Sequence, residues 1–133
     1  MAAKASQLTP RARRLRAGIL SIPGLMEGAD VFSDGDAFWI DAKEIAVFDG
    51  ERLGVRLTRR VISEHRDVLK NDPRVDRRGK SSDWVMVSIA GDSDMAFALH
   101  LVELAAEAHR PPAGTPLRPP PEGRDLERRR RFH

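Results

Sequence analysis

The chain has 133 residues, of which 41% are hydrophobic and 32% charged, and this is the size and composition of one soluble globular domain. It contains no cysteine, which excludes a disulfide framework, a cysteine-based zinc finger and a thiol nucleophile. No apolar run reaches the roughly 18 residues of a membrane span, and no apolar segment follows the charged N-terminus as in a secretory signal. We therefore expect a cytoplasmic protein that does not enter a membrane.

The formal net charge of +3 is divided unevenly along the chain. Residues 1–16 carry a charge of +5 and residues 110–133 carry +4, which leaves −6 for the stretch between them. A basic chain suggests a nucleic-acid partner, but here the predicted body is acidic and the positive charge lies at its two ends. This division weakens the nucleic-acid interpretation and leaves it open.

Residues 1–7 are expected to be disordered, and a helix is predicted to follow them. Thr9 supplies a cap, Pro10 occupies the first helical position, and Pro23–Gly24 ends the helix near Ser21. The apolar face of this helix is formed by Leu8, Ala12, Leu15 and Ile19. The other face carries Arg11, Arg13, Arg14 and Arg16, which are expected to face solvent or, alternatively, to bind phosphate.

Residues 37–58 alternate apolar and polar side chains, a pattern that predicts a meander of three short strands. The strands are predicted at residues 38–41, 44–49 and 52–58. Tight turns are expected at Ala42–Lys43 and Asp49–Gly50. A loop or an irregular edge strand is expected before them at residues 24–36, and the rest of the chain is expected to pack on the meander.

A second helix from Thr58 to Asn71, a short strand at Val75, a strand at Asp83–Ala90 and a long helix ending near His109 complete the predicted body. One face of the second helix is expected to hold Val61, Ile62, His65, Val68 and Leu69. The last helix has the widest apolar stripe, so it is expected to lie across the sheet as the most buried helix.

The predicted fold class is α+β, with an antiparallel sheet of four or five strands and about three helices, most of them on one face. Residues 8–109 are expected to form this single domain. Residues 110–133 contain six prolines and end in an arginine run, so they are expected to form an extended tail. This tail could still lie along the body through Leu117, Leu126 or Phe132.

Standard catalytic and cofactor motifs are absent from the sequence: there is no nucleophile elbow, no phosphate-binding glycine loop and no paired histidine or cysteine motif. We therefore expect no metal and no cofactor. Asp30, Asp34 and Asp36 lack the remaining ligands of a calcium loop. Trp39 and Trp84 are expected on neighbouring strands, most simply as core and alternatively as the wall of a small-molecule site.

Four segments resemble, in their order and spacing, the luciferase-like domain family, which comprises small bacterial and fungal domains related to the enzymes of fungal bioluminescence. They are FWIDAKEIAVFDGERLGVRLTRRV, DPRV, SDWVMVSI and the helix end AHRPP, and the resemblance runs from about Leu20 to Arg110. For the fungal relatives it implies oxidation of a pyrone-type luciferin by molecular oxygen without a metal or a flavin. For bacterial members it implies little beyond the fold. The second meander strand of the family often carries a His-x-His before the turn, and Val47 and Asp49 occupy those places here.

The first functional hypothesis is a luciferase-like domain that binds a small apolar or aromatic ligand, with oxygen-dependent oxidation as a further step. Trp39, Phe48 and Trp84 would form its apolar wall. Arg56 would be a polar contact, and Asp49 is the candidate catalytic base.

Two alternatives stay open. A looser resemblance, to the double-wing, frataxin-like family of bacterial DNA-binding proteins, supports a nucleic-acid-binding module. The residues of that module would be Arg11, Arg13, Arg14, Arg77, Arg78, Arg129 and Arg130. The other alternative is a protein-interaction domain whose exposed sheet edge pairs with a partner, including a second copy of the chain.

Overall fold

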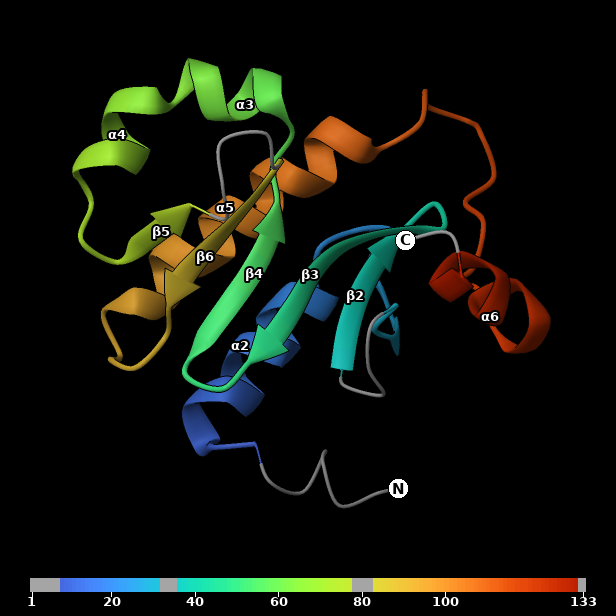
Figure 1. The fold of residues 1–133 in the computed structure, drawn as a ribbon, viewed down its shortest axis with the longest axis horizontal. Coiled ribbons are helices and arrows are strands. Elements are labelled where there is room, and N and C mark those ends of the chain that lie inside the picture. Colours follow the sequence, from blue (N-terminus) through green and yellow to red (C-terminus); the bar gives the residue numbers. More distant parts are fainter. Residues whose placement is uncertain (1–7, 32–35, 78–82, 132–133) are drawn as a thin grey trace.

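The structure is a computed structural model that describes residues 8–31, 36–77 and 83–131. Within these residues the chain forms one antiparallel sheet of six strands in the order β1-β2-β3-β4-β6-β5, together with five helices (Figure 1). The strands are β1 (Met26–Ala29), β2 (Asp36–Ile40), β3 (Lys43–Asp49), β4 (Arg52–Arg56), β5 (Val75–Arg77) and β6 (Trp84–Ser88). The helices are α2 (Pro10–Leu20), α3 (Arg59–Glu64), α4 (Arg66–Asn71), α5 (Asp94–His109) and α6 (Gly123–Arg131).

The predicted α+β class is confirmed, although the prediction of four or five strands and about three helices is lower than the six strands and five helices of the described residues. The loop or edge strand expected at residues 24–36 contains β1, which pairs with β2 along its whole length. The helix count is also higher, because α6 was not predicted and because the predicted second helix is divided into α3 and α4. The expected disorder of residues 1–7 lies outside the described part of the chain.

The meander is confirmed as β2, β3 and β4, with its first turn one residue earlier than expected. This turn consists of Asp41 and Ala42, whose φ angles are 49° and 60°. Two consecutive residues with positive φ form the hairpin turn whose twist matches that of the flanking strands. Because neither residue is glycine, the turn holds a backbone conformation that L-residues adopt at a cost.

The prediction of one helix from Thr58 to Asn71 was wrong, because the chain leaves the helical conformation at His65, where φ is −109° and ψ is 24°. The break changes the helical phase between α3 and α4. Leu69 therefore reaches the core, whereas Val68, expected on the same face, is 56% exposed.

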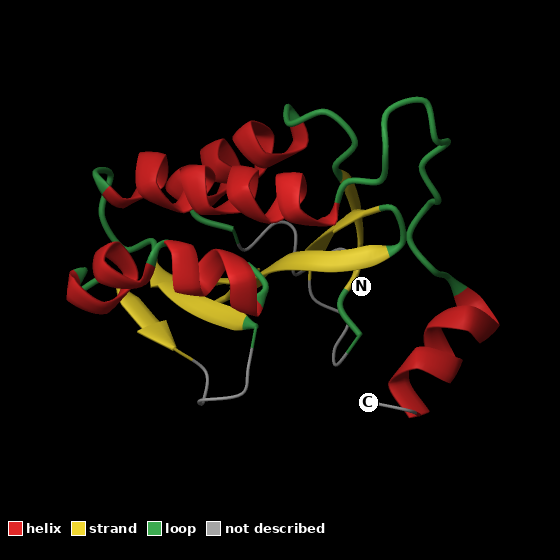
Figure 2. Ribbon diagram, turned by 90° about the horizontal axis from the view of Figure 1, so that it is seen from above, coloured by secondary structure: helices red, strands yellow, loops and turns green. Residues whose placement is uncertain are grey.

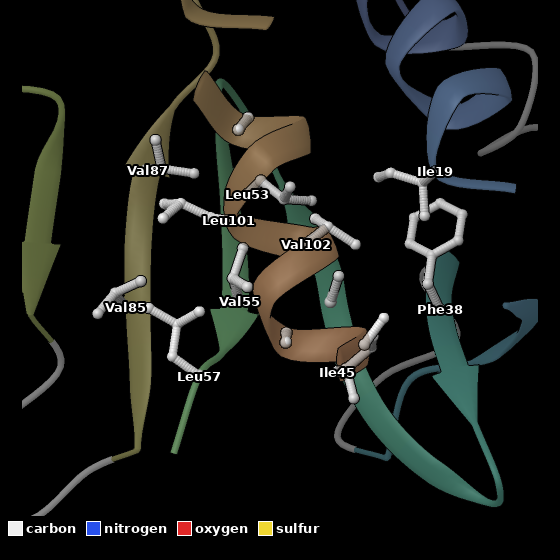
Figure 3. Packing of buried hydrophobic residues seen from close by; sticks show 14 of the residues in the cluster. Ile19, Phe38, Ile45, Leu53, Val55, Leu57, Val85, Val87, Leu101 and Val102 are labelled. Carbon is white, nitrogen blue, oxygen red and sulfur yellow. The ribbon is translucent and has the colours of Figure 1, made fainter. Parts of the chain in front are cut away.

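The main core lies between the sheet and the helices α2 and α5, on the face that we call the inner face. Figure 2 shows α2 and α5 on this side of the sheet and α6 on the other side. Figure 3 shows Leu101 and Val102 of α5 directed toward Leu53 and Val55 of β4, and all four side chains are buried. The expected position of the last helix across the sheet is thus confirmed, since α5 packs on β3, β4 and β6.

Residues 110–131, which we call the C-terminal segment, cross from the end of α5 to the opposite side of the sheet. The extended chain that was expected is present up to Glu122, where the prolines prevent regular structure. It is not present beyond Glu122, because residues 123–131 form α6. This stretch contains no proline, and five of its nine residues are arginine, which favours a helix.

Candidate functional site

The face of the sheet opposite α5, which we call the outer face, carries the side chains that alternate with the core residues. Trp39 of β2 belongs to a separate small cluster with Val31 and Ala37, against which Val47 of β3 packs. This second cluster shows that the outer face is also apolar, although the helix on that side, α6, has no buried residue of its own. The outer face is where we place the candidate site.

A β-bulge directs Glu44 of β3 to the outer face. Phe38 pairs with Ala46, but Trp39 pairs with Glu44, so Ile45 is the additional residue. Ile45 and Ala46 both belong to the inner core as a result. Glu44 therefore shares the outer face with its partner Trp39, and bulges that redirect a side chain in this way are frequent beside functional sites.

Glu44 forms a buried acid pair with Asp30. Glu44 is 7% exposed and Asp30 is 8% exposed, and their carboxyl groups are hydrogen-bonded to each other. The pKa of Glu44 is raised to about 9, first by burial and then by the hydrogen bond to Asp30 and the negative charge of Asp30. Glu44 is thus a neutral acid at neutral pH. Among the described residues, its Oε2 atom is buried and has no hydrogen-bond partner, a condition that is rare in folded proteins.

An apolar floor lies beside the acid pair on β3, β4 and β6. Gly54 is its centre, because a Cβ atom there would lie 3.2 Å from Val47 Cγ1, 3.3 Å from Met86 Sδ and 3.6 Å from Trp84 Cε3. Any larger residue at this position would have to push these side chains aside. Val47, Gly54, Met86 and Trp84 therefore form one continuous surface.

Arg56 borders this floor and provides a charged group near Glu44. It lies opposite Trp84 in the β4–β6 pairing, and its Nε donates a hydrogen bond of 2.8 Å to Asp83 Oδ2. Its positive charge is close enough to Glu44 to oppose part of the rise in pKa. We call Glu44, Val47, Arg56, Trp84 and Met86 the outer-face site.

The C-terminal segment covers the neighbouring part of the outer face. The guanidinium group of Arg129 lies 5.6 Å from the centroid of the Trp39 ring, and Trp39 is 1% exposed. Arg130 donates hydrogen bonds to the carbonyl oxygens of Val31 and Asp30, at 2.9 and 3.1 Å. The helix α6 is therefore held directly above the acid pair and its tryptophan neighbour.

The strained turn between β2 and β3 is the second attachment point of this segment. Arg118 binds the Asp41 carboxylate through its backbone N–H and its Nε, both at 3.1 Å. Arg129 Nη1 donates to the Ala42 carbonyl oxygen at 2.6 Å. Both residues of the turn are thus used to hold the chain end.

The predicted ligand wall is only partly assembled. Trp39, Arg56 and Trp84 do lie on the outer face, but the expectation that the tryptophans occupy neighbouring strands was wrong, because β3 and β4 separate β2 from β6. Phe48 faces the inner side, where its ring lies edge-on to Phe38 at 5.6 Å. It therefore packs against the core and is not part of the wall.

Asp49, the predicted base, lies at the β3–β4 hairpin and is exposed, with Arg52 3.9 Å away. Asp49 is five positions after Glu44 in β3, which corresponds to roughly 16 Å along the strand. The structure therefore does not bring Asp49 together with the acid pair.

Most described arginines of the nucleic-acid alternative are engaged with the protein itself. Arg11 and Arg14 bind Asp92, at 2.9 and 3.3 Å, and Arg129 and Arg130 bind the body as described above. Arg13 is exposed. The Arg77 side chain and Arg78 lie outside the described part of the structure. The described arginines of this alternative therefore lie on two helices, α2 and α6, on opposite sides of the sheet.

Sequence reasoning did not identify Asp30 and Glu44 as partners. The available signal was Glu44 itself, a carboxylate that directly precedes the apolar run IAVF in a strand. Strict alternation would have placed it on the same face as Ala46, and only the bulge reverses that assignment. Asp30 stands in a different strand-loop region, so its contact with Glu44 has no local sequence pattern.

Within residues 8–31, 36–77 and 83–131, no group of three or more histidine, cysteine or carboxylate side chains is arranged to hold a metal ion. In the same residues, no helix is long and apolar enough to cross a membrane. Comparison with known proteins gives no match to this chain among family models, curated proteins or solved structures.

Proposed function

We propose that the chain binds a small molecule with an aromatic or similar apolar ring at the outer-face site, and that a hydroxyl group of this molecule pairs with Glu44. The observation that carries the proposal is the buried Glu44 Oε2 atom, which lacks a hydrogen-bond partner among the described residues. The resemblance to the luciferase-like family favours a hydroxylated pyrone as the ligand class.

The chemistry of Glu44 suits such a ligand. A neutral carboxyl group has one donor and one acceptor function, whereas an ionised carboxylate can only accept. A ring hydroxyl can also both donate and accept, so it can pair with Oε2 whichever oxygen of Glu44 carries the proton. The ring itself would lie on the floor formed by Val47, Met86 and Trp84, consistent with the mostly apolar lining of ligand sites.

We propose binding without an assigned oxidation step. At the two places where the resembled family often carries histidine, Val47 belongs to the floor and Asp49 lies at the hairpin tip. Glu44 could move a proton, but it is held in the neutral form and is not a base at neutral pH.

The C-terminal segment bears directly on this function, because α6 lies over Trp39 at the border of the site. A ligand that reaches Glu44 from above has to displace α6, which reduces its apparent affinity. Deletion of residues 123–133 is therefore expected to strengthen binding.

The test uses 3-hydroxy-2-methyl-4-pyrone, whose hydroxyl group stays protonated at neutral pH, as the probe and its 3-methoxy analogue as the matched ligand. Binding is followed in NMR spectra through the indole N–H signals, which are only two because the chain has two tryptophans. Trp84→Phe assigns the Trp39 signal. The hydroxy compound is expected to shift both signals in a saturable way and to bind more tightly than the methoxy compound.

Substitutions of Glu44 identify its role. Glu44→Leu is expected to weaken binding of the hydroxy compound about tenfold, the value of one good hydrogen bond, whereas Glu44→Gln retains a donor and an acceptor and is expected to bind. Glu103→Leu, on the exposed side of α5, is the control. Equal binding of both pyrones, or unchanged binding by Glu44→Leu, contradicts the proposal.

A further inference from the structure

A groove lies at the other end of the molecule, between the helices α3 and α4 and the edge strand β5. Figure 1 shows these three elements together at the β5 end of the sheet. The groove has a volume of about 390 Å³ and is lined by Ile62, Arg66, Leu69, Lys70 and Val75. This volume is within the roughly 300–1,000 Å³ that is usual for sites of small ligands.

The wall of the groove is apolar and firmly built. Ile62 and Leu69 are 6% and 2% exposed and belong to the main core, against which Val75 also packs. The break at His65 turns α4 so that Leu69 faces inward. The wall is therefore part of the folded core and does not depend on a movable side chain.

The rim of the groove is positively charged. Arg66 and Lys70 are one helical turn apart on α4, so they lie on the same side of the helix. Both are exposed, and neither has an ion-pair partner among the described residues.

The carboxylates near the groove form ion pairs with arginines other than Arg66. Glu64 binds Arg60 at 3.4 Å, Asp72 binds Arg74 at 2.7 Å, and Asp76 lies 3.7 Å from Arg52. Asp67 lies directly after Arg66 and three positions before Lys70, and it forms no ion pair with either of them in the part of the chain that the structure describes. The two cations are thus available to an external anion.

We propose that this groove binds a small organic anion with an apolar tail, such as a medium-chain carboxylate. The tail would lie against Ile62, Leu69 and Val75, and the head group would contact Arg66 and Lys70. Charge complementarity and the apolar wall together select this class, because an inorganic anion would not use the wall and an alcohol would not use the cations. Val75 belongs to the inner side of the sheet, and the groove shares no residue with the outer-face site, so it is a second and independent site.

The experiment is an NMR titration of the full chain with octanoate, compared with octanol and with inorganic phosphate. Octanoate is expected to shift the signals of Ile62, Leu69 and Val75 in a saturable way. Arg66→Gln combined with Lys70→Gln is expected to weaken octanoate binding about tenfold, as for the loss of hydrogen bonds to charged groups. The matched control combines Arg13→Gln with Arg124→Gln, which removes two exposed arginines from α2 and α6.

A second variant tests the apolar wall separately. Val75→Phe places a larger side chain in the groove, and it is expected to abolish octanoate binding while the spectrum stays that of a folded protein. The proposal is overturned by any of three results: no saturable shift at the groove, equal binding of octanol, or binding of phosphate alone as tightly as octanoate. Unchanged octanoate binding by the Arg66 and Lys70 double variant overturns it as well.

Discussion

The inner face of the sheet is covered by α2 and α5 through apolar side chains, whereas the outer face near β1 and β2 is covered by the C-terminal segment through arginines. On the inner face, Leu101 and Val102 of α5 are fully enclosed. On the outer face, α6 has no buried residue, and its contacts are guanidinium groups on backbone carbonyls and on Trp39.

The difference has a physical consequence for function. Apolar burial on the inner face is the main source of folding free energy and cannot be removed without unfolding. Polar contacts of an exposed helix are individually weak, so they can be exchanged for contacts with a ligand or with water. The inner cover thus holds the fold together, and the outer cover is the part that can move without loss of the fold.

The largest expected effect is on the inner cover. Leu101→Ala should reduce the free energy of unfolding by about 2–5 kcal/mol, since it leaves a cavity in a tightly packed core. Leu126→Ala, on the half-buried side of α6, is the matched control and should cost far less. Urea denaturation measures both. Similar losses of unfolding free energy for the two variants would show that α6 contributes to stability as much as α5 does.

The acid pair on the outer face should give the protein an unusual pH dependence. The pKa of Glu44 is about 9 in the folded chain, against an ordinary value of 4.5. Between these values the folded state retains a proton that the unfolded state has released, so the free energy of unfolding falls as the pH rises, by as much as roughly 1.4 kcal/mol per pH unit. Glu44→Gln should remove most of this dependence.

The measurement is best made between about pH 7 and about pH 9. Burial lowers the pKa of His109 below its ordinary value of 6.5, so in that range this histidine is neutral in the folded state and mostly neutral in the unfolded state. Glu103→Gln, at an exposed position, should retain the slope of the original protein. A flat dependence in the unsubstituted chain would mean that Glu44 is ionised and that the acid pair does not exist as described.

Removal of α6 should have a smaller effect on stability and a clear effect on Trp39. Deletion of residues 123–133 is expected to lower the free energy of unfolding by about 1–2 kcal/mol, because the deletion removes mainly hydrogen bonds from charged donors. The fluorescence of Trp39, measured in the Trp84→Phe background, should shift to longer wavelength as the ring becomes exposed. Loss of the folded state on deletion would show that the outer cover is as essential as α5.

The smallest expected effect comes from the attachment at the turn. Arg118→Gln removes the ion pair with Asp41 and should make the C-terminal segment more rapidly cleaved in limited proteolysis, with little change in overall stability. Arg124→Gln, an exposed arginine of α6, is the control and should be cleaved at the original rate. Equal cleavage rates of the two variants would show that the Arg118–Asp41 ion pair does not hold the C-terminal segment.

Much of the fold could be predicted because its elements have local patterns. Alternation over residues 37–58 predicts β2, β3 and β4, and the apolar stripe of residues 94–109 predicts α5 and its place on the sheet. The boundaries of α2 follow from Thr9, whose side chain accepts the Ala12 N–H, and from Pro10. These features depend on residues a few positions apart, and such residues interact in the same way wherever the element finally lies.

The candidate site could not be predicted to the same extent, because it is made by contacts between distant parts of the chain. Trp39 and Arg56 were identified as candidates. Three other features depend on the bulge at Ile45: Phe48 packs against the core, Glu44 faces outward, and Asp30 is the partner of Glu44. A one-residue irregularity reverses every side chain beyond it, and alternation alone does not reveal it.

The sequence by itself determined the α+β class, the meander, the main helices and the polar character of the chain end. The tertiary structure decided that β6 lies between β4 and β5, that the chain end lies over Trp39, and that Asp30 and Glu44 share a buried hydrogen bond. The physical reason is that hydrophobic periodicity encodes which side of an element is buried, and it does not encode which distant element covers that side.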